Sequence, residues 1–533
     1  MKASVRVVDF WLCVFVSIRC AFPAAPELTI EIRDYVTMPM TGAVDGKTNS
    51  AGLLAKVNVL LQEPGPSKNR FFVNDVNGPL YILDRETKAL STYLDLNGLP
   101  GHSGIFHKLA IDNLLASGFV TFRFDPDYPR NGKFYTIHME DPTLQASNLP
   151  DNKGFPGLKT DGYLPTPAIA PFGATQRESV IVEWTDSDIS NSTFEGTARE
   201  LMRVQYNGRI HPMGDLIFNP TARRGDPDWR VMYISSGDGG SGEQRSDIRG
   251  NPQRLDNLVG KILRIVPDLK EQAESSTISE NGRYRIPNDN PFAGKQGTRK
   301  EIWAYGLRNP HRMSWDVDPA DRSKNHLIAN VIGLRTWETV VIIRKGANYG
   351  YSLREGPEQL NADNTLSKPP EDDQIAVHVN ESATDGMVAP RYPVIAYGHV
   401  KGTGGDAISN GFVYRGQAIP ALRGKFIFGD ITTGHVWWAD FQEMLAADDG
   451  DPKTMAEMHE IKIAWNKEVY GTMAPITEKA YHERGGKAEH LPGAARVAGG
   501  RSDIRFAMDS DGEMYILSKS DGMIRAIRGA TAK

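Results

Sequence analysis

The sequence predicts an all-β protein built as a six-bladed β-propeller with long inter-strand loops. A strand–turn–strand pattern recurs along the chain, its last five copies are spaced by about 95 residues, and long segments with the 3.6-residue period of a helix are scarce. The chain has 533 residues, among them 52 glycines and 33 prolines, which predicts many turns.

Each copy of the repeat is a short alternating strand, a turn rich in Asp, Asn, Pro or Gly, and a second strand rich in apolar and aromatic residues. The copies begin near Phe71, Phe122, Ile217, Ser314, Gly411 and Arg505. One hairpin cannot bury a face alone, so six similar units packed around an axis would cover each other. A pair of β-sandwiches is the alternative architecture. The polar, Pro/Gly-rich stretches 265–300 and 355–390 are interpreted as insertions or loops.

The N-terminal 25 residues are typical of a secretory signal peptide. Lys2 and Arg6 precede an apolar run over 10–18, and small residues follow at 21–25. An ordinary N-terminal strand is the alternative. The run is too short to span a bilayer, and no other apolar run approaches 20 residues, so no membrane span is expected. The prediction is therefore a secreted or periplasmic protein.

Removal of that segment would leave a chain without cysteine, because Cys13 and Cys20 are its two cysteines. Disulfides, a thiolate nucleophile and a cysteine metal site are then excluded. The predicted domains are a lead-in segment over 26–64 and the propeller over 65–530. The net charge of −5 argues against a nucleic-acid-binding surface or a polybasic membrane anchor.

His211 is the first candidate for chemistry, because it stands just before a predicted strand and ahead of a glycine-rich loop. An imidazole with a pKa of about 6.5 can take a proton at neutral pH. The alternative is a histidine in a turn that is hydrogen-bonded to the backbone and has no chemical role. The loop holds a formal G-x-G-x-x-G at Gly237, Gly239 and Gly242, but the polar residues after it show no helical period. A glycine-rich loop at a blade end is therefore favoured over a dinucleotide site.

The stretch 301–312 carries several specific side chains in one short run. Arg308, Asn309 and Arg312 offer donors suited to an anion or to carbonyl groups. A buried arginine that ties loops together is an equal alternative.

An ordered set of motifs spans much of the chain. It comprises His211-x-x-Gly214, Ser236-Gly-Asp-Gly239, Gln253-x-Leu-x-Asn-x-x-Gly-Lys-Ile-Leu-Arg264, Ile286-Pro-Asn-Asp-Asn-Pro-Phe292, Glu301-Ile-Trp-x-Tyr-Gly-x-Arg-Asn-Pro310, Gly346-x-Asn-Tyr-Gly350 and Tyr414-Arg-Gly…Ile419-Pro-x-Leu-Arg-Gly424. Together these motifs resemble the soluble glucose/sorbosone dehydrogenase family, the quinoprotein aldose dehydrogenases, which has a hedgehog-interacting-protein-like branch. The resemblance covers about residues 65–530.

The resemblance implies a six-bladed propeller and an oxidoreductase that oxidises an aldose at C1 to the lactone. The hydride would pass to pyrroloquinoline quinone (PQQ), a calcium ion would polarise the quinone carbonyls, and His211 matches the family's base. The residues carried over to the cofactor site are Gly237, Asp238, Gln253, Arg254, Arg308, Asn309 and His435. The calcium ligands are left unassigned.

Several positions depart from the dehydrogenase pattern. Ala116 replaces a Gln, Ser241-Gly242 replaces an Arg-Asn pair, His435 stands where another basic residue is expected, and Val331 stands where many members have Asp. PQQ is a tricarboxylate whose pocket should be rich in cations and amide donors. A non-catalytic propeller that binds a sugar or a protein partner is therefore the second hypothesis, and a propeller hydrolase is the third.

Overall fold

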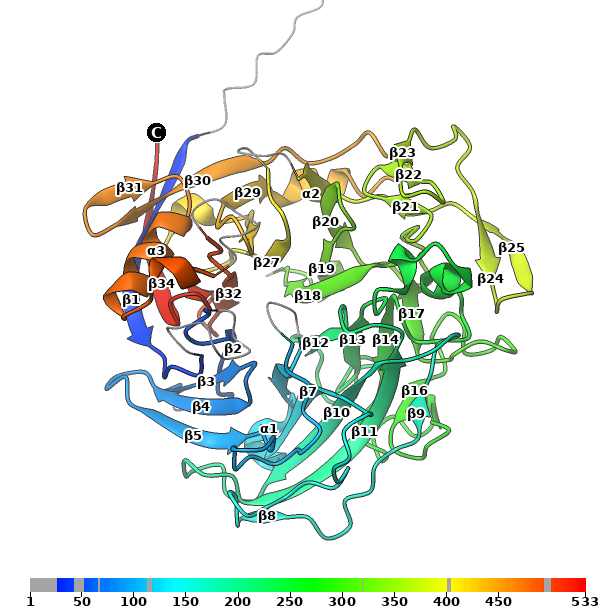
Figure 1. The fold of residues 1–533 in the computed structure, drawn as a ribbon. Coiled ribbons are helices and arrows are strands. Elements are labelled where there is room, and N and C mark those ends of the chain that lie inside the picture. Colours follow the sequence, from blue (N-terminus) through cyan, green and yellow to red (C-terminus); the bar gives the residue numbers. More distant parts are fainter. Residues whose placement is uncertain are drawn as a thin grey trace, which may run out of the picture.

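The computed structural model describes residues 26–42, 52–65, 68–112, 117–318, 320–399, 404–492 and 500–533. The expected signal peptide and Ala116 lie outside these residues. The fold is all-β, as the sequence predicts, and its sheets follow one another around a ring in chain order (Figure 1). Among the described residues, no helix has both the length and the apolar character needed to cross a bilayer.

Four sheets begin at their innermost strand and run outward with antiparallel neighbours. The first sheet contains β2 (Val57–Gln62), β3 (Arg70–Asp75), β4 (Pro79–Asp84) and β5 (Leu90–Asp95). The second contains β6 (Phe119–Phe124), β7 (Lys133–Glu140), β10 (Arg177–Asp186) and β11 (Gly196–Tyr206), with the two-residue strands β8 (Leu158–Lys159) and β9 (Ala168–Ile169) paired to β11. The third contains β12 (Met213–Phe218), β13 (Met232–Ser236), β14 (Lys261–Ile265) and β17 (Ile302–Tyr305). The fourth contains β18 (Asn309–Asp316), β19 (His326–Ile332), β20 (Trp337–Ile342) and β26 (Ile395–Gly398).

A nine-stranded sheet combines two further antiparallel runs. One run contains β27 (Ile408–Val413), β28 (Lys425–Asp430), β29 (Val436–Asp440) and β30 (His459–Trp465), with β31 (Glu468–Tyr470) paired to β30. The other contains β32 (Ile504–Met508), β33 (Met514–Ser518), β34 (Met523–Ala532) and β1 (Leu28–Thr37). The two runs join because β1 pairs in parallel with β30 as well as antiparallel with β34.

β1 brings the N-terminal part of the described chain beside its C-terminal strand (Figure 1). The range 26–64, expected as a lead-in segment, thus contains two strands of the sheets: β1 pairs with β34, and β2 pairs with β3. The boundaries 26–64 and 65–530 stay predictions.

Short strands and helices lie outside these runs. The stretches interpreted as insertions hold β15 (Ser276–Ile278) with β16 (Arg285–Pro287), β21 (Arg354–Glu355) to β23 (Leu366–Ser367) through β22 (Glu358–Leu360), and β24 (Ile375–His378) with β25 (Thr384–Val388). The α-helices are α1 (Tyr128–Asn131), α2 (Phe441–Ala446) and α3 (Ala474–Glu483). The 3-10 helices are η1 (Ser241–Glu243), η2 (Asp247–Gln253), η3 (Arg322–Lys324), η4 (Pro420–Leu422) and η5 (Ala488–His490).

The hydrophobic core lies between neighbouring sheets, because side chains alternate between the two faces of each strand. On β4, Leu80 and Ile82 pack towards the second sheet, whereas Tyr81 and Leu83 pack in the cluster shared with β32–β34. Each of the six buried clusters found among the described residues joins two adjacent four-stranded runs. Every run therefore has both faces covered.

A substitution at Ile30 tests how much β1, the strand that pairs with both β34 and β30, contributes to stability. Its side chain is fully buried in the cluster shared by β27–β30 and β32–β34. We expect Ile30→Ala to lower the free energy of unfolding by about 2–5 kcal/mol, because it leaves a cavity in a packed core. Chemical denaturation measures this. Glu31→Ala, at the exposed neighbouring position, is the control, and equal effects of the two changes would contradict a packing role for β1.

Candidate functional site

His211 lies in the turn that enters β12, the innermost strand of the third sheet. Its φ of 52° places it in the left-handed region that non-glycine residues seldom adopt. Its Nδ1 lies 2.7 Å from Oδ1 of Asp238, and its side chain is 11% exposed. With Nδ1–H donating to the carboxylate, Nε2 is left as the acceptor nitrogen of a neutral imidazole.

Asp238 is held by the glycine-rich loop that follows β13. The backbone N–H groups of Gly240 and Gly242 donate to its two carboxylate oxygens at 2.9 and 3.0 Å. Burial opposes the charge on this carboxyl, but His211, Arg308 and these N–H groups outweigh it and lower the pKa of Asp238. A side chain at Gly237 would meet the carbonyl oxygen of His211 at 2.4 Å, so the loop can pass beneath His211 only with glycine there.

Arg308 lies beside this pair, just before β18. Its backbone oxygen accepts from the Asp238 N–H at 2.7 Å. Its guanidinium forms an ion pair with Glu243 and donates to the carbonyl of Gly333. Glu243 also lies 3.9 Å from Nδ1 of His211. The structure therefore brings His211, Gly237, Asp238 and Arg308 together, with Asn309 next to them as the first residue of β18.

The other predicted site residues form interactions with partners of their own. Gln253 donates to Asn348 and to the Tyr351 carbonyl. Arg254 forms a two-pronged ion pair with Asp256 and lies 4.9 Å from the Phe172 ring. His435 stacks on Trp437 with the ring centroids 5.2 Å apart. The structure does not bring these three residues into the His211 cluster.

Ser241 and Gly242, which replace the Arg-Asn pair of the dehydrogenase pattern, form the first turn of η1. A side chain at Gly242 would meet the Tyr351 ring at 2.3 Å, so this aromatic ring occupies the space that a larger residue would need. The Tyr351 hydroxyl is buried and has no hydrogen-bond partner in the described part of the chain.

A group of buried cations was not identified from the sequence. Arg501, Arg505 and Lys519 lie 2.8, 3.1 and 3.8 Å from the carboxylate of one residue, Asp503. They come from the entrance to β32 and the turn after β33, the ends of those strands that correspond to the His211 end of β12. Burial, together with repulsion from Arg505, lowers the pKa of Lys519 well below its ordinary value.

His311 and Arg312 on β18 connect the cation group to the third sheet. Arg312 donates to the backbone oxygen of Gly214, three residues after His211. Burial and the positive charges of Arg312 and Arg505 lower the pKa of His311 well below its ordinary value. The alternating Arg501, Asp503 and Arg505 were the one sequence signal for this group, but charged residues that alternate at a strand entrance are equally common on solvated surfaces.

A carboxylate–imidazole pair lies in the fourth sheet. Glu338 is fully buried and accepts from Nε2 of His399 at 2.8 Å and from the Ile408 N–H at 2.7 Å. Burial raises the pKa of Glu338 to about 7. Burial also opposes the charge on His399, but the bond to Glu338 outweighs it and raises the pKa of His399.

Comparison with known proteins identifies the chain's relatives. Residues 66–460 match the Glucose / Sorbosone dehydrogenase family. The HIPL1 protein of Arabidopsis thaliana is 29% identical over 333 residues, 60% of this chain and 43% of that protein. The aldose sugar dehydrogenase YliI of Escherichia coli K12 is 39% identical over 105 residues, 20% of this chain and 23% of that protein.

A third relative is the human Hedgehog-interacting protein, 25% identical over 280 residues, which are 52% of this chain and 32% of that protein. The chain thus spans less than half the length of these curated relatives. Among solved structures, the apo-form of the soluble aldose sugar dehydrogenase from Escherichia coli superposes with a TM-score of 0.50 at 19% identity, covering 90% of this chain and 98% of that one. This last likeness concerns the fold alone.

The raised pKa of Glu338 predicts a pH dependence of stability. The folded chain holds the extra proton between the ordinary value of 4.5 and about 7, so this group makes the free energy of unfolding fall as the pH rises through that window. The raised pKa of His399 acts in the same direction. We expect Glu338→Gln to remove a decline of about 3 kcal/mol, measured by denaturant titration at several pH values. Glu371→Gln, at an exposed position, is the control, and an unchanged pH profile in Glu338→Gln would contradict the assignment.

Proposed function

Because this chain belongs to the glucose/sorbosone dehydrogenase family, we propose that it is an oxidoreductase that oxidises an aldose sugar or a similar alcohol at C1 to the lactone. The observation that carries the proposal is the His211–Asp238 pair, which lies at 2.7 Å at the position where the family's base is expected. Export to the periplasm or the cell exterior, based on the N-terminal 25 residues, belongs to the same proposal.

A six-bladed β-propeller is the architecture we infer for this function. Support comes from six antiparallel four-stranded runs and from six buried clusters, each between two neighbouring runs. The innermost strands then converge on one axis. Residues at the entrances of these strands, such as His211, would face a shared site at one end of the axis.

The chemistry assigned to His211 is general base catalysis. Nε2 would take the proton of the C1 hydroxyl as hydride leaves that carbon, and the resulting imidazolium would be stabilised by the Asp238 carboxylate. Asp238 also fixes the tautomer and the orientation of the ring, and it is itself held by the loop N–H groups. When bound, PQQ supplies the hydride acceptor.

The cation group offers PQQ a set of charged partners within this chain. Three carboxylates need cations or amide donors, and within the described ranges Arg501, Arg505 and Lys519 form ion pairs with one carboxylate, that of Asp503. Nε of Arg505 and Nε2 of His311 are buried and have no hydrogen-bond partner among the described residues. We therefore assign the holding of PQQ to this group. Arg308 and Arg254, expected in that role from the sequence, are neutralised by Glu243 and Asp256.

We assign no residues to a calcium site. Among the residues that the structure describes, no group of three or more His, Cys, Asp or Glu side chains is placed to hold a metal ion. No step of the proposed reaction is routed through the ion.

A non-catalytic propeller that binds a sugar or a protein partner is the second candidate. The observation in its favour is the neutralised Arg308, together with the Tyr351 ring that packs over Gly242. In that case the same loops would present a recognition surface without a cofactor.

The base is tested with His211→Ala in a dye-reduction assay with an aldose and added PQQ. We expect activity to fall by about 10²–10⁴-fold, while calorimetry shows PQQ affinity close to that of the wild type. Asp238→Asn should also lower activity, because the imidazole would lose its oriented tautomer. His482→Ala, on α3, is the control. Full activity in His211→Ala would contradict its role as base.

The cofactor assignment is tested by calorimetric titration of PQQ into the wild type and Arg501→Gln. Loss of one charged partner should weaken PQQ binding by roughly tenfold or more, whereas Arg528→Gln, at an exposed position of β34, should not. No binding to the wild type at high micromolar PQQ would overturn the quinoprotein function and favour the non-catalytic candidate.

A further inference from the structure

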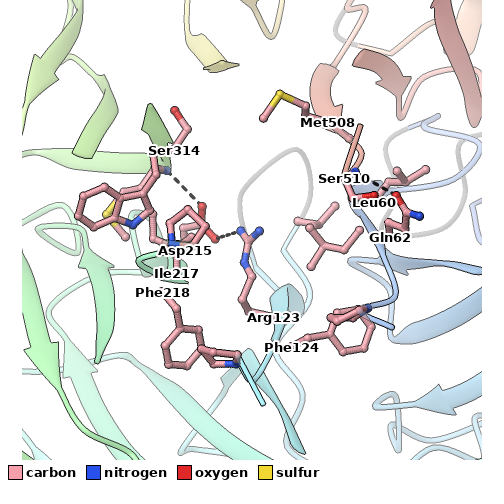
Figure 2. A pocket seen from close by; sticks show the side chains of 18 of the residues that line it. Leu60, Gln62, Arg123, Phe124, Asp215, Ile217, Phe218, Ser314, Met508 and Ser510 are labelled. Atoms are coloured by element: carbon pink, nitrogen blue, oxygen red, sulfur yellow. Dashed lines mark hydrogen bonds and ion pairs between the residues drawn. The ribbon is translucent and has the colours of Figure 1, made fainter. Parts of the chain in front are cut away.

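A cavity of about 640 Å³ lies at the opposite end of the innermost strands. Its wall includes the last residues of β2, β6, β12 and β32, among them Arg123, Phe124, Ile217 and Phe218 (Figure 2). His211 precedes β12, whereas the cavity is lined by this strand from Asp215 to its end at Phe218, so at about 3.3 Å per residue the lining begins roughly 13 Å beyond His211. This cavity is therefore separate from the proposed sugar site.

The wall of the cavity is mostly apolar. Its apolar members include Leu60, Phe124, Ile217, Phe218, Met313 and Met508. A concave, mainly apolar site of this volume with a few polar groups is typical of small-molecule binding. A free sugar, with a hydroxyl on nearly every carbon, would leave many of its hydrogen bonds unmade against such a wall.

Two guanidinium groups lie in this wall, and one of them, Arg123, is paired with a carboxylate. Arg123 donates to Oδ1 of Asp215 at 3.2 Å and to the Leu216 carbonyl at 3.0 Å, and its head projects into the cavity (Figure 2). Arg312 is bonded to backbone carbonyls, including that of Val120 at 3.3 Å, and it has no carboxylate within 4 Å among the described residues. One positive charge is thus in excess at the inner end of the cavity.

The other charged side chains of the wall all have ion-pair partners. Glu63 pairs with Arg70 at 2.5 Å and Lys68 pairs with Asp511 at 2.5 Å, whereas Asp125 shares Arg230 with Asp268 and Glu271. Among the charged side chains of the wall, positive charge is therefore in excess locally, at Arg123 and Arg312, and there it favours a ligand with one negative charge.

Unpaired polar atoms provide a second, independent observation. The Ser314 hydroxyl and the Asn58 carbonyl oxygen belong to side chains of the wall that are 6% and 5% exposed, and neither has a hydrogen-bond partner in the described chain. The indole nitrogens of Trp229 and Trp315, two further residues of the wall, are also unpaired. Buried polar atoms without partners are costly. Each of these atoms has almost no accessible surface, so a ligand with polar atoms can satisfy them only where their side chains turn towards the cavity.

We propose that this cavity binds a small amphipathic carboxylate, a molecule with an apolar aliphatic or aromatic body and one carboxylate group. The carboxylate lies at Arg123, near Asp215 and Arg312, and the apolar body lies along Ile217, Phe218 and Met508. The site does not depend on the proposed sugar oxidation, since none of its residues belongs to the His211 cluster; Arg312 also neighbours His311 beside the cation group.

The test compares decanoate with decanol by calorimetry on the full chain. Decanoate should bind roughly tenfold or more tightly than decanol, because only the acid offers a charged acceptor to Arg123. Arg123→Gln should remove this preference and leave decanol binding unchanged. Arg130→Gln, an exposed arginine on α1, is the matched control and should keep the preference.

A second variant locates the ligand. Ala222→Trp places a large side chain in the cavity wall and should weaken decanoate binding at least tenfold, whereas Ala89→Trp, on the exposed turn after β4, should not. Thermal unfolding midpoints within a few degrees of the wild type show that the variants fold. Absence of decanoate binding, equal affinity for decanol, or decanoate binding unaffected by both Arg123→Gln and Ala222→Trp would overturn the proposal.

Discussion

The mutual burial of sheet faces is the interaction on which the rest of this structure depends. Each four-stranded run has an apolar residue set on both faces, and each face packs against a different neighbour, as Leu80 and Tyr81 do on adjacent positions of β4. Such a sheet cannot be stable alone, because one apolar face would always meet water. A closed ring covers every face. β1 pairs with β34 and β30 where the chain returns to its start.

This ring gives the two ends of the innermost strands different chemical characters. At the end where these strands begin, polar residues such as His211, Arg308 and Arg501 are largely shielded from solvent and paired with neighbouring carboxylates. At the end where the strands finish, apolar side chains surround an open cavity. A single scaffold thus provides a polar site and an apolar site without separate domains.

The repeat that the sequence displays follows the sheets closely but not completely. The copies near Phe122, Ile217, Ser314, Gly411 and Arg505 fall on the innermost strands β6, β12, β18, β27 and β32. The copy near Phe71 falls on β3, the second strand of its sheet. A strand–turn–strand pattern recurs within a single sheet as well as between sheets, so period alone does not distinguish the innermost hairpin from its neighbour.

The sequence by itself determined the all-β class, the family motifs and the position of a strand-entrance histidine ahead of a glycine-rich loop. These depend on local alternation, turn residues and short spacings, which are read directly along the chain. Only the tertiary structure decided which cations have a carboxylate partner of their own and which share one. Arg308 is neutralised by Glu243, 65 residues away, whereas Arg501, Arg505 and Lys519 converge on one carboxylate. Ion pairing depends on distances of a few ångströms between distant segments, and no local pattern encodes such distances.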